Sequence, residues 1–261
     1  MTLLLHGQTG SHFLDRLSDE NFKLLRPSMT LVELSRNEVL CVPGAAVEYA
    51  WFPLSAVLSV VTVMADGHEV EACTIGHESA YGLLNSLGAP NALDRVIAQV
   101  PGQAIKIPTS RLNAAAGLSL QLTDLIVRHA QAAIAQTQQS VACNAVHSVE
   151  QRLCRWLLMT QDRARDSRVK LTQEFLGFML GVQRTTVTMS AKRLQAAGLI
   201  RYSRGRIEIL DRDGLLAGAC ECYCSVMEKH AMVLGNRPFN ASDPFSSPKV
   251  GKGTNGLEAV V

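Results

Sequence analysis

The stretch that decides the fold is 171-LTQEFLGFMLGVQRTTVTMSAKRLQAAGLI-200. It predicts two short helices around a tight turn. Thr172 is a preferred N-cap, because its hydroxyl can accept a hydrogen bond from a first-turn amide. Gly181 interrupts the helical pattern where a turn needs it, and Gly198 stands where a helix C-terminus prefers glycine. A helix-turn-helix of this kind offers its second helix, from about Arg184 to Ala197, to the major groove of DNA.

The start of that second helix carries polar side chains and no carboxylate. Arginine can bond guanine through two hydrogen bonds, glutamine can bond adenine, and a threonine methyl can contact a thymine methyl. Basic residues further along can hold phosphates. The alternative is a solvated face on an ordinary helical pair. The predicted DNA-binding residues are Thr172, Gln183, Arg184, Thr185, Thr186, Thr188, Met189, Lys192, Arg193 and Arg204.

A hairpin follows the second helix. In Leu199–Leu210 (LIRYSRGRIEIL), two β-rich runs flank Ser203-Arg204-Gly205. Arg204 lies at the tip, with Arg201 and Arg206 beside it. A basic hairpin after a helix-turn-helix is typical of a wing, whose arginines reach the phosphate backbone or the minor groove.

The charge distribution indicates that only one half of the chain binds a polyanion. Residues 150–212 hold 13 of the 25 Lys and Arg and 6 of the 23 Asp and Glu. The net charge of this segment is therefore +7 and that of the rest of the chain is −5, which together give the net charge of +2 for the whole chain. A basic region joined to an acidic one favours DNA contact by the basic region alone.

Residues 171–210, together with the preceding Cys143–Leu158 (CNAVHSVEQRLCRWLL), resemble the Crp/Fnr family of bacterial transcription regulators. The resemblance extends over about residues 13–225. It implies an α+β fold with an N-terminal β-roll of the jelly-roll, cyclic-nucleotide-binding type, a long dimerisation helix and a C-terminal winged helix. The implied function is that of a homodimer that reads a palindromic operator, controlled by an unidentified small effector at the β-roll. The alternative is an effector-binding signalling module that acts through protein contacts rather than DNA.

The N-terminal half shows many short strand-like runs between turn signals. Asp66-Gly67 separates residues 57–64 from 69–75 and is a strong hairpin signal. Pro101-Gly102 marks another turn. This spacing predicts a β-barrel or β-sandwich, among which the resemblance selects the jelly roll. The expected domains are a β-roll effector domain (1–116), a dimerisation helix (117–145), a winged helix-turn-helix domain (146–235) and a disordered tail (236–261).

Residues 109–145 predict one long helix with a short helical lead-in, and this helix carries two apolar stripes. A seven-residue repeat favours a coiled-coil seam between two protomers, and a second stripe can pack on the β-domain. The alternative is a helix that packs only on its own domain. The predicted seam is Leu120, Val127, Ile134 and Val141, with Thr123, Ala130 and Thr137 between them, and the second stripe is Leu122, Leu125, Ile126 and Ala133.

The resemblance also raises the question of a cyclic nucleotide. Family members that bind one share a cassette in which Gly-Glu takes the ribose and an Arg followed by Ser or Thr takes the phosphate. Here Leu83 follows Gly82 and Val96 follows Arg95, so cyclic AMP is not the expected effector. Charged residues of this region can serve another ligand or form a surface ion pair that contributes little. The candidate effector-pocket residues are Gly76, Glu78, Gly82 and Arg95.

The 7 cysteines are an odd number spread along the chain, which argues against a disulfide framework. The only cluster is Cys220-Glu221-Cys222-Tyr223-Cys224. On a helix, Cys220 and Cys224 would share a face while Cys222 points elsewhere. With no fourth ligand at zinc-finger spacing, partly buried thiols and no metal are expected. The iron–sulfur cluster of Fnr-type sensors rests on an N-terminal cysteine group, and no cysteine precedes Cys41, so no cofactor is expected.

Enzymatic motifs are absent from the sequence, which has no dinucleotide fingerprint, P-loop or nucleophile elbow. No apolar run reaches the roughly 18 residues that span a bilayer. We therefore expect a cytoplasmic protein that is neither an enzyme nor a membrane protein. The expected partners are double-stranded DNA, a second copy of the chain and a small effector, with RNA polymerase as a further candidate.

Overall fold

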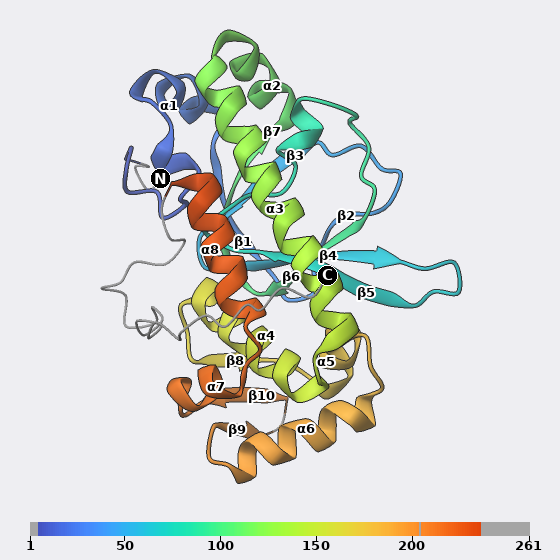
Figure 1. Ribbon diagram of the computed structural model, residues 1–261. Helices are drawn as coiled ribbons and strands as arrows, with labels where there is room; N and C mark the ends of the chain where they lie inside the picture. The colour runs from blue at the N-terminus through green and yellow to red at the C-terminus, as the bar shows by residue number, and fades with distance from the viewer. Residues whose placement is uncertain (1–4, 204, 236–261) are drawn as a thin grey trace, which may run out of the picture.

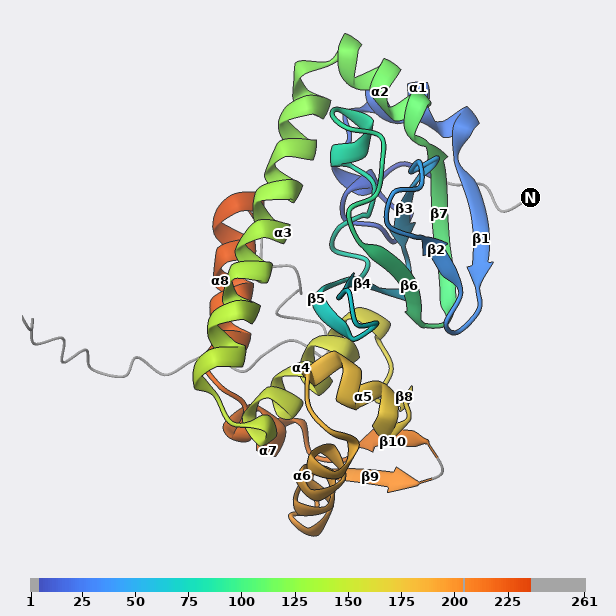
Figure 2. The ribbon, with the colours of Figure 1, turned by 90° about the vertical axis from the view of Figure 1, so that its right-hand side faces the viewer.

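The computed structural model describes residues 5–203 and 205–235 (Figure 1). Arg204, at the predicted wing tip, and the predicted tail 236–261 lie outside these residues. A β-domain forms one half and a mainly helical domain the other, and a long helix runs along one side of both (Figures 1 and 2). No helix of the described residues is long and apolar enough to cross a membrane.

Two antiparallel sheets build the β-domain. One has the strand order β1-β7-β3, and the other has the order β2-β6-β4-β5. The predicted hairpin around Asp66-Gly67 is confirmed, because β4 pairs with β5. The strands are β1 (Thr30–Leu34), β2 (Val39–Cys41), β3 (Tyr49–Pro53), β4 (Val57–Val63), β5 (Glu69–Ile75), β6 (Arg95–Val100) and β7 (Gly102–Pro108).

The turn at Pro101-Gly102 carries the chain from one sheet to the other, since β6 and β7 lie in different sheets. A Cβ at Gly102 would lie 2.7 Å from Ser55 Oγ, so glycine permits this close crossing. Short helical elements precede β1 and separate β5 from β6. They are η1 (Leu14–Arg16), α1 (Asp19–Leu25), η2 (Arg26–Ser28) and η3 (Leu84–Ser86).

The predicted long helix and its lead-in are α3 (Leu120–Val146) and α2 (Thr109–Leu118). Ser119 separates them in an extended conformation and caps α3, since its hydroxyl accepts from Leu122 N at 3.2 Å. Two residues of the second stripe, Leu122 and Ile126, are buried on the β-domain at 1% and 0% exposure. The predicted seam faces outward instead, with exposures of 88% (Leu120), 43% (Val127), 54% (Ile134) and 67% (Val141).

The C-terminal domain is a winged helix with one strand that the sequence analysis did not predict. Its sheet has the order β8-β10-β9, in which β8 adds a third strand to the predicted wing hairpin. A capping box of Ser148 and Gln151 starts its first helix. The elements are α4 (Val149–Ala164), β8 (Arg168–Lys170), α5 (Gln173–Leu180), α6 (Arg184–Ala196), β9 (Ile200–Ser203), β10 (Arg206–Ile209), α7 (Arg212–Gly218) and α8 (Cys222–Leu234).

The two domains share one apolar core. Val61 and Ile97 of the β-domain belong to the same buried cluster as Trp156 of α4 and Met179 of α5. The last helix, α8, runs back beside α3 toward the β-domain (Figures 1 and 2). There Arg16 donates a hydrogen bond to the carbonyl oxygen of Leu234 at 2.5 Å. The C-terminal domain is therefore packed firmly against the rest of the molecule.

Candidate nucleic-acid interface

The helix-turn-helix forms as its sequence predicts. Thr172 caps α5, because its hydroxyl accepts from Phe175 N at 3.2 Å. Gly181 ends α5 in the left-handed region with φ +61°, and Gly198 follows α6 with φ +75°. A Cβ at Gly177 would meet the carbonyl oxygen of Val182 at 2.9 Å, so glycine also lets the turn fold closely over α5. The local signals of the chain thus determine the position of α6.

Helix α6 has one buried and one exposed face. Val187, Ala191 and Leu194 are 0%, 2% and 3% exposed and anchor the helix in the shared core. The other face leaves the predicted base-reading and phosphate-binding residues open to solvent. The exposed residues of the predicted set on this element are Gln183, Arg184, Thr185, Met189, Lys192 and Arg193.

Besides the cap residue Thr172, two members of the predicted DNA-binding set have side-chain partners within the described residues. Thr188 Oγ1 lies 2.7 Å from Gln173 Oε1 and 2.9 Å from the Arg184 carbonyl oxygen, so it holds α5 to α6. Arg193 pairs with Glu150 at 3.4 Å. Across the residues the structure describes, no carboxylate pairs with Arg184 or Lys192. Those two cations are available to a polyanion.

The wing lies beside α6. Gln195 Oε1 of α6 accepts a hydrogen bond from Tyr202 N at 2.8 Å, which fixes the angle between helix and hairpin. Arg201 pairs with Glu208 at 2.8 Å across the hairpin, and Arg201 and Arg206 are both exposed. Because these arginines share one end of the domain with α6, they extend its positive surface.

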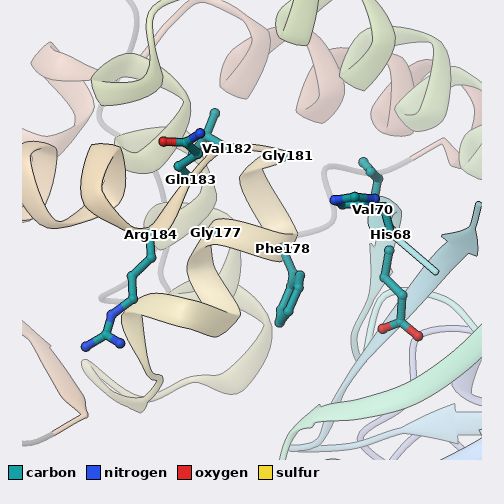
Figure 3. A pocket seen from close by; sticks show the side chains of 9 residues that line it. His68, Val70, Gly177, Phe178, Gly181, Val182, Gln183 and Arg184 are labelled. Carbon is teal, nitrogen blue, oxygen red and sulfur yellow. The ribbon is translucent and has the colours of Figure 1, made fainter. Parts of the chain in front are cut away.

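A groove of about 490 Å³ separates the helix-turn-helix from the β4–β5 hairpin. Figure 3 shows Phe178 of α5 directed into this space and Arg184 directed away from the hairpin. On the hairpin side, Glu69 pairs with Arg95 at 2.6 Å. The acidic hairpin residue is therefore neutralised next to the start of α6.

A buried ion pair joins the two domains. Glu78 Oε1 lies 2.6 Å from Arg163 Nε of α4, and the two side chains are only 2% and 3% exposed. Arg163 also donates to Gln136 Oε1 of α3 at 3.1 Å, and Gln136 donates to the Thr74 carbonyl oxygen at 3.1 Å. Burial by itself raises the pKa of Glu78, but Arg163 and His77 outweigh it and lower the pKa to about 2. Glu78 is thus a charged link between domains.

The four candidate effector residues are not gathered around one cavity. Glu78 faces Arg163, and Arg95 faces Glu69. Gly76 allows α4 to approach, since a Cβ there would lie 2.6 Å from Arg163 Cβ. The sequence analysis did not foresee Arg163, because no local pattern indicates a partner 85 residues away.

A cavity of about 450 Å³ lies between the β-domain and α3, and of the four candidates only Gly82 borders it. Its walls are mainly apolar, and its charged lining residue is Asp94; neither lysine nor arginine lines it among the described residues. Leu83, 4% exposed, stands in this wall. On the helix side the lining includes Ala130, Ile134 and Thr137, three residues of the predicted seam.

Four potential metal ligands converge at the other end of α3. They are Cys143, His147, Cys220 and Cys222, and their donor atoms all lie within 4.8 Å of one another. The expectation that Cys220 and Cys224 share a helical face is wrong, because α8 begins only at Cys222. The search for a fourth ligand at zinc-finger spacing from Cys220 did not find Cys143 and His147, because both are distant from it in sequence.

Comparison with known proteins agrees with this architecture. Residues 151–217 match the Crp-like helix-turn-helix domain. The chain is 25% identical to the global nitrogen regulator of Nostoc sp. over a stretch of 187 residues. This stretch covers 67% of this chain and 82% of the Nostoc protein.

Solved structures share the fold over most of the chain. FixK2 from Bradyrhizobium japonicum superposes with a TM-score of 0.62 at 16% identity, over 74% of this chain and 98% of that one. A transcriptional regulator of the CRP/FNR family from Thermus thermophilus has a TM-score of 0.58 at 18% identity, over 73% and 98% of the two chains. The chain is therefore similar to Crp/Fnr regulators in two respects, a Crp-like helix-turn-helix domain over residues 151–217 and a fold shared over most of its length.

Proposed function

We propose that this protein is a transcription regulator of the Crp/Fnr type, that it binds a palindromic operator as a homodimer, and that a small molecule at the β-domain controls its affinity for DNA. In this proposal α6 enters the major groove, Arg184 reads a base edge, and Lys192 with the wing arginines holds phosphates. The alternative, a signalling module that acts through protein contacts, would have no use for an exposed cationic helix face.

The observation that carries the proposal is the division of α6 into two faces. Val187, Ala191 and Leu194 are buried, which leaves Arg184 and Lys192 exposed and without a carboxylate partner in the described residues. A recognition helix needs this arrangement, because its side chains must be free to exchange water for base edges and phosphates.

Support for the homodimer comes from the exposed stripe of α3. Leu120, Val127, Ile134 and Val141 recur every seven residues and are 43% to 88% exposed. Apolar side chains at this spacing favour a two-helix seam. A dimer with its two-fold axis along α3 would present two copies of α6 to DNA. Their half-sites should lie one helical turn apart, about 34 Å.

The effector would occupy the 450 Å³ cavity between the β-domain and α3. Because Ala130, Ile134 and Thr137 belong to both the cavity wall and the seam stripe, an occupant would touch the residues that set the packing of the dimer. A ligand that favours one packing over another shifts the population toward it. The apolar lining suits an uncharged or apolar molecule better than a cyclic nucleotide, whose phosphate needs a cation.

Selection from random DNA with the full-length protein, followed by mobility-shift titration, tests this function. We expect a two-fold symmetric site, much weaker binding to an isolated half-site, and affinity that falls steeply with salt. Equal affinity for half-site and full site would contradict the dimer. Failure to select any DNA, with no salt-dependent binding, would favour the protein-contact module instead.

A further inference from the structure

The Cys/His group lies where three segments of the chain meet. Cys143 is near the end of α3, His147 is in the link from α3 to α4, and Cys220 and Cys222 stand at the start of α8. Cys143 Sγ is 3.5 Å from Cys220 Sγ, and Cys222 Sγ is 3.5 Å from His147 Nδ1. The three thiols are buried and form a cluster of their own.

These distances are those of ligands around one metal ion. In a tetrahedral zinc site the Zn–S bonds are about 2.3 Å and the Zn–N bonds about 2.0–2.1 Å, which puts neighbouring donor atoms roughly 3.5–3.8 Å apart. Three cysteines and one histidine are a common ligand set of structural zinc sites. An iron–sulfur cluster places several atoms between its thiolates, so it requires wider spacing than this group has.

The surroundings orient the ligands as a zinc site requires. His147 Nε2 lies 3.1 Å from Glu221 Oε2, which leaves Nδ1 facing Cys222. Ligating histidines commonly bond a carboxylate through their other nitrogen in this way. Gln139 donates to Cys222 Sγ at 3.1 Å, and Lys229 in turn donates to Gln139 at 2.6 Å.

A buried cation balances the charge of such a site. Three thiolates and Zn²⁺ together carry one negative charge. Arg155 is only 8% exposed, and its positive charge acts on both Cys143 and Cys220. Its Nε and Nη1 have no hydrogen-bond partner in the part of the chain that the structure describes. A guanidinium in this state is costly to bury unless an anionic group lies nearby.

We propose that Cys143, His147, Cys220 and Cys222 bind one zinc ion in each protomer. The winged helix from α4 to α7 lies between His147 and Cys220 in sequence, so the ion closes the base of the DNA-binding domain. It also attaches α8 to the end of α3. Cross-links that close long loops stabilise a fold by restricting its unfolded state, and metal binding adds its own free energy to folding.

Metal analysis of the full-length protein, purified with reductant, tests the site directly. We expect one zinc per chain, and Co²⁺ in its place should show the visible bands of tetrahedral coordination and thiolate charge transfer. Cys143→Ser and Cys222→Ser should lose the metal. Cys224→Ser is the matched control, because it removes a thiol from the same helix outside the ligand group, and it should keep one zinc.

Glu221→Gln separates metal binding from folding, since the Glu221 side chain is 74% exposed. The variant should fold normally by circular dichroism and bind zinc about 10- to 100-fold more weakly in competition with a chelator. Chelation should lower the melting temperature of the wild type and of Cys224→Ser alike. Substoichiometric zinc in a folded protein, a Cys143–Cys220 disulfide under reducing purification, or iron with acid-labile sulfide would each overturn the proposal.

Discussion

Glu78→Gln removes one charge from the ion pair that joins the β-domain to α4. Both side chains are at most 3% exposed, so Arg163 would remain buried without its counterion. Breaking such a pair costs about 3–5 kcal/mol of the free energy of unfolding. An independent route gives a similar figure, because the pKa of Glu78 falls from its usual 4.5 to about 2 and each unit corresponds to roughly 1.4 kcal/mol. We therefore expect a loss of roughly 3 kcal/mol.

Urea unfolding at pH 7 measures this loss. The matched control is Glu69→Gln, because Glu69 also pairs with an arginine at 2.6 Å but the pair is 27% and 37% exposed. Exposed pairs contribute about 0–1 kcal/mol. The double variant Glu78→Gln/Arg163→Met should recover part of the stability, since no unpaired charge remains buried. If Glu78→Gln were no more destabilising than Glu69→Gln, the buried pair would not be a link between the domains.

The lowered pKa of Glu78 gives the free energy of unfolding a pH dependence of definite sign. A carboxyl whose pKa is lowered by folding stabilises the protein fully above its unfolded pKa and loses that contribution as the pH falls. For Glu78 the window lies between about pH 4.5 and pH 2. Glu78→Gln should therefore flatten the stability curve in this range. Parallel curves for variant and wild type would show that Glu78 titrates normally in the folded protein.

Four other features lead to predictions. Arg184→Ala should cost about 1–3 kcal/mol of operator-binding free energy and relax specificity at one base pair. Lys192→Ala should weaken binding to all DNA sequences alike and reduce the slope of log affinity against log salt concentration by about 1. An unchanged specificity profile in Arg184→Ala would make Arg184 a phosphate contact. Val127→Asp should give a sedimenting monomer that no longer binds the operator, while Val39→Asp, equally 43% exposed but on the β2 edge strand, should stay dimeric; a Val127→Asp dimer would refute the seam. Burial lowers the pKa of His129 from 6.5 to about 3, so His129 should reduce the free energy of unfolding by roughly 2 kcal/mol between pH 7 and pH 5. Urea unfolding should show a smaller decline over this range in His129→Gln. Calorimetry should detect no micromolar binding of cyclic AMP, because the cavity wall offers its phosphate no cation.

Local sequence determined the helix-turn-helix almost completely. Thr172 caps α5, Gly181 turns the chain and Gly198 follows α6, as each residue's own conformational preference predicts. The two stripes of α3 could likewise be predicted from the sequence, because helical spacing alone decides which side chains share a face. Turn signals located the strands of the β-domain, and the resemblance to the Crp/Fnr family supplied their arrangement as a jelly roll.

Only the tertiary structure decided which distant residues meet. Turn residues at Pro101-Gly102 do not reveal that β6 and β7 belong to different sheets, since strand pairing depends on packing across the whole domain. Glu78 meets Arg163 across 85 residues, and Cys143 meets Cys220 across 77. Periodicity and capping describe what a segment prefers by itself. A buried ion pair or a ligand group exists only once α4 and α8 have packed against the long helix, because burial and convergence are properties of the assembled core.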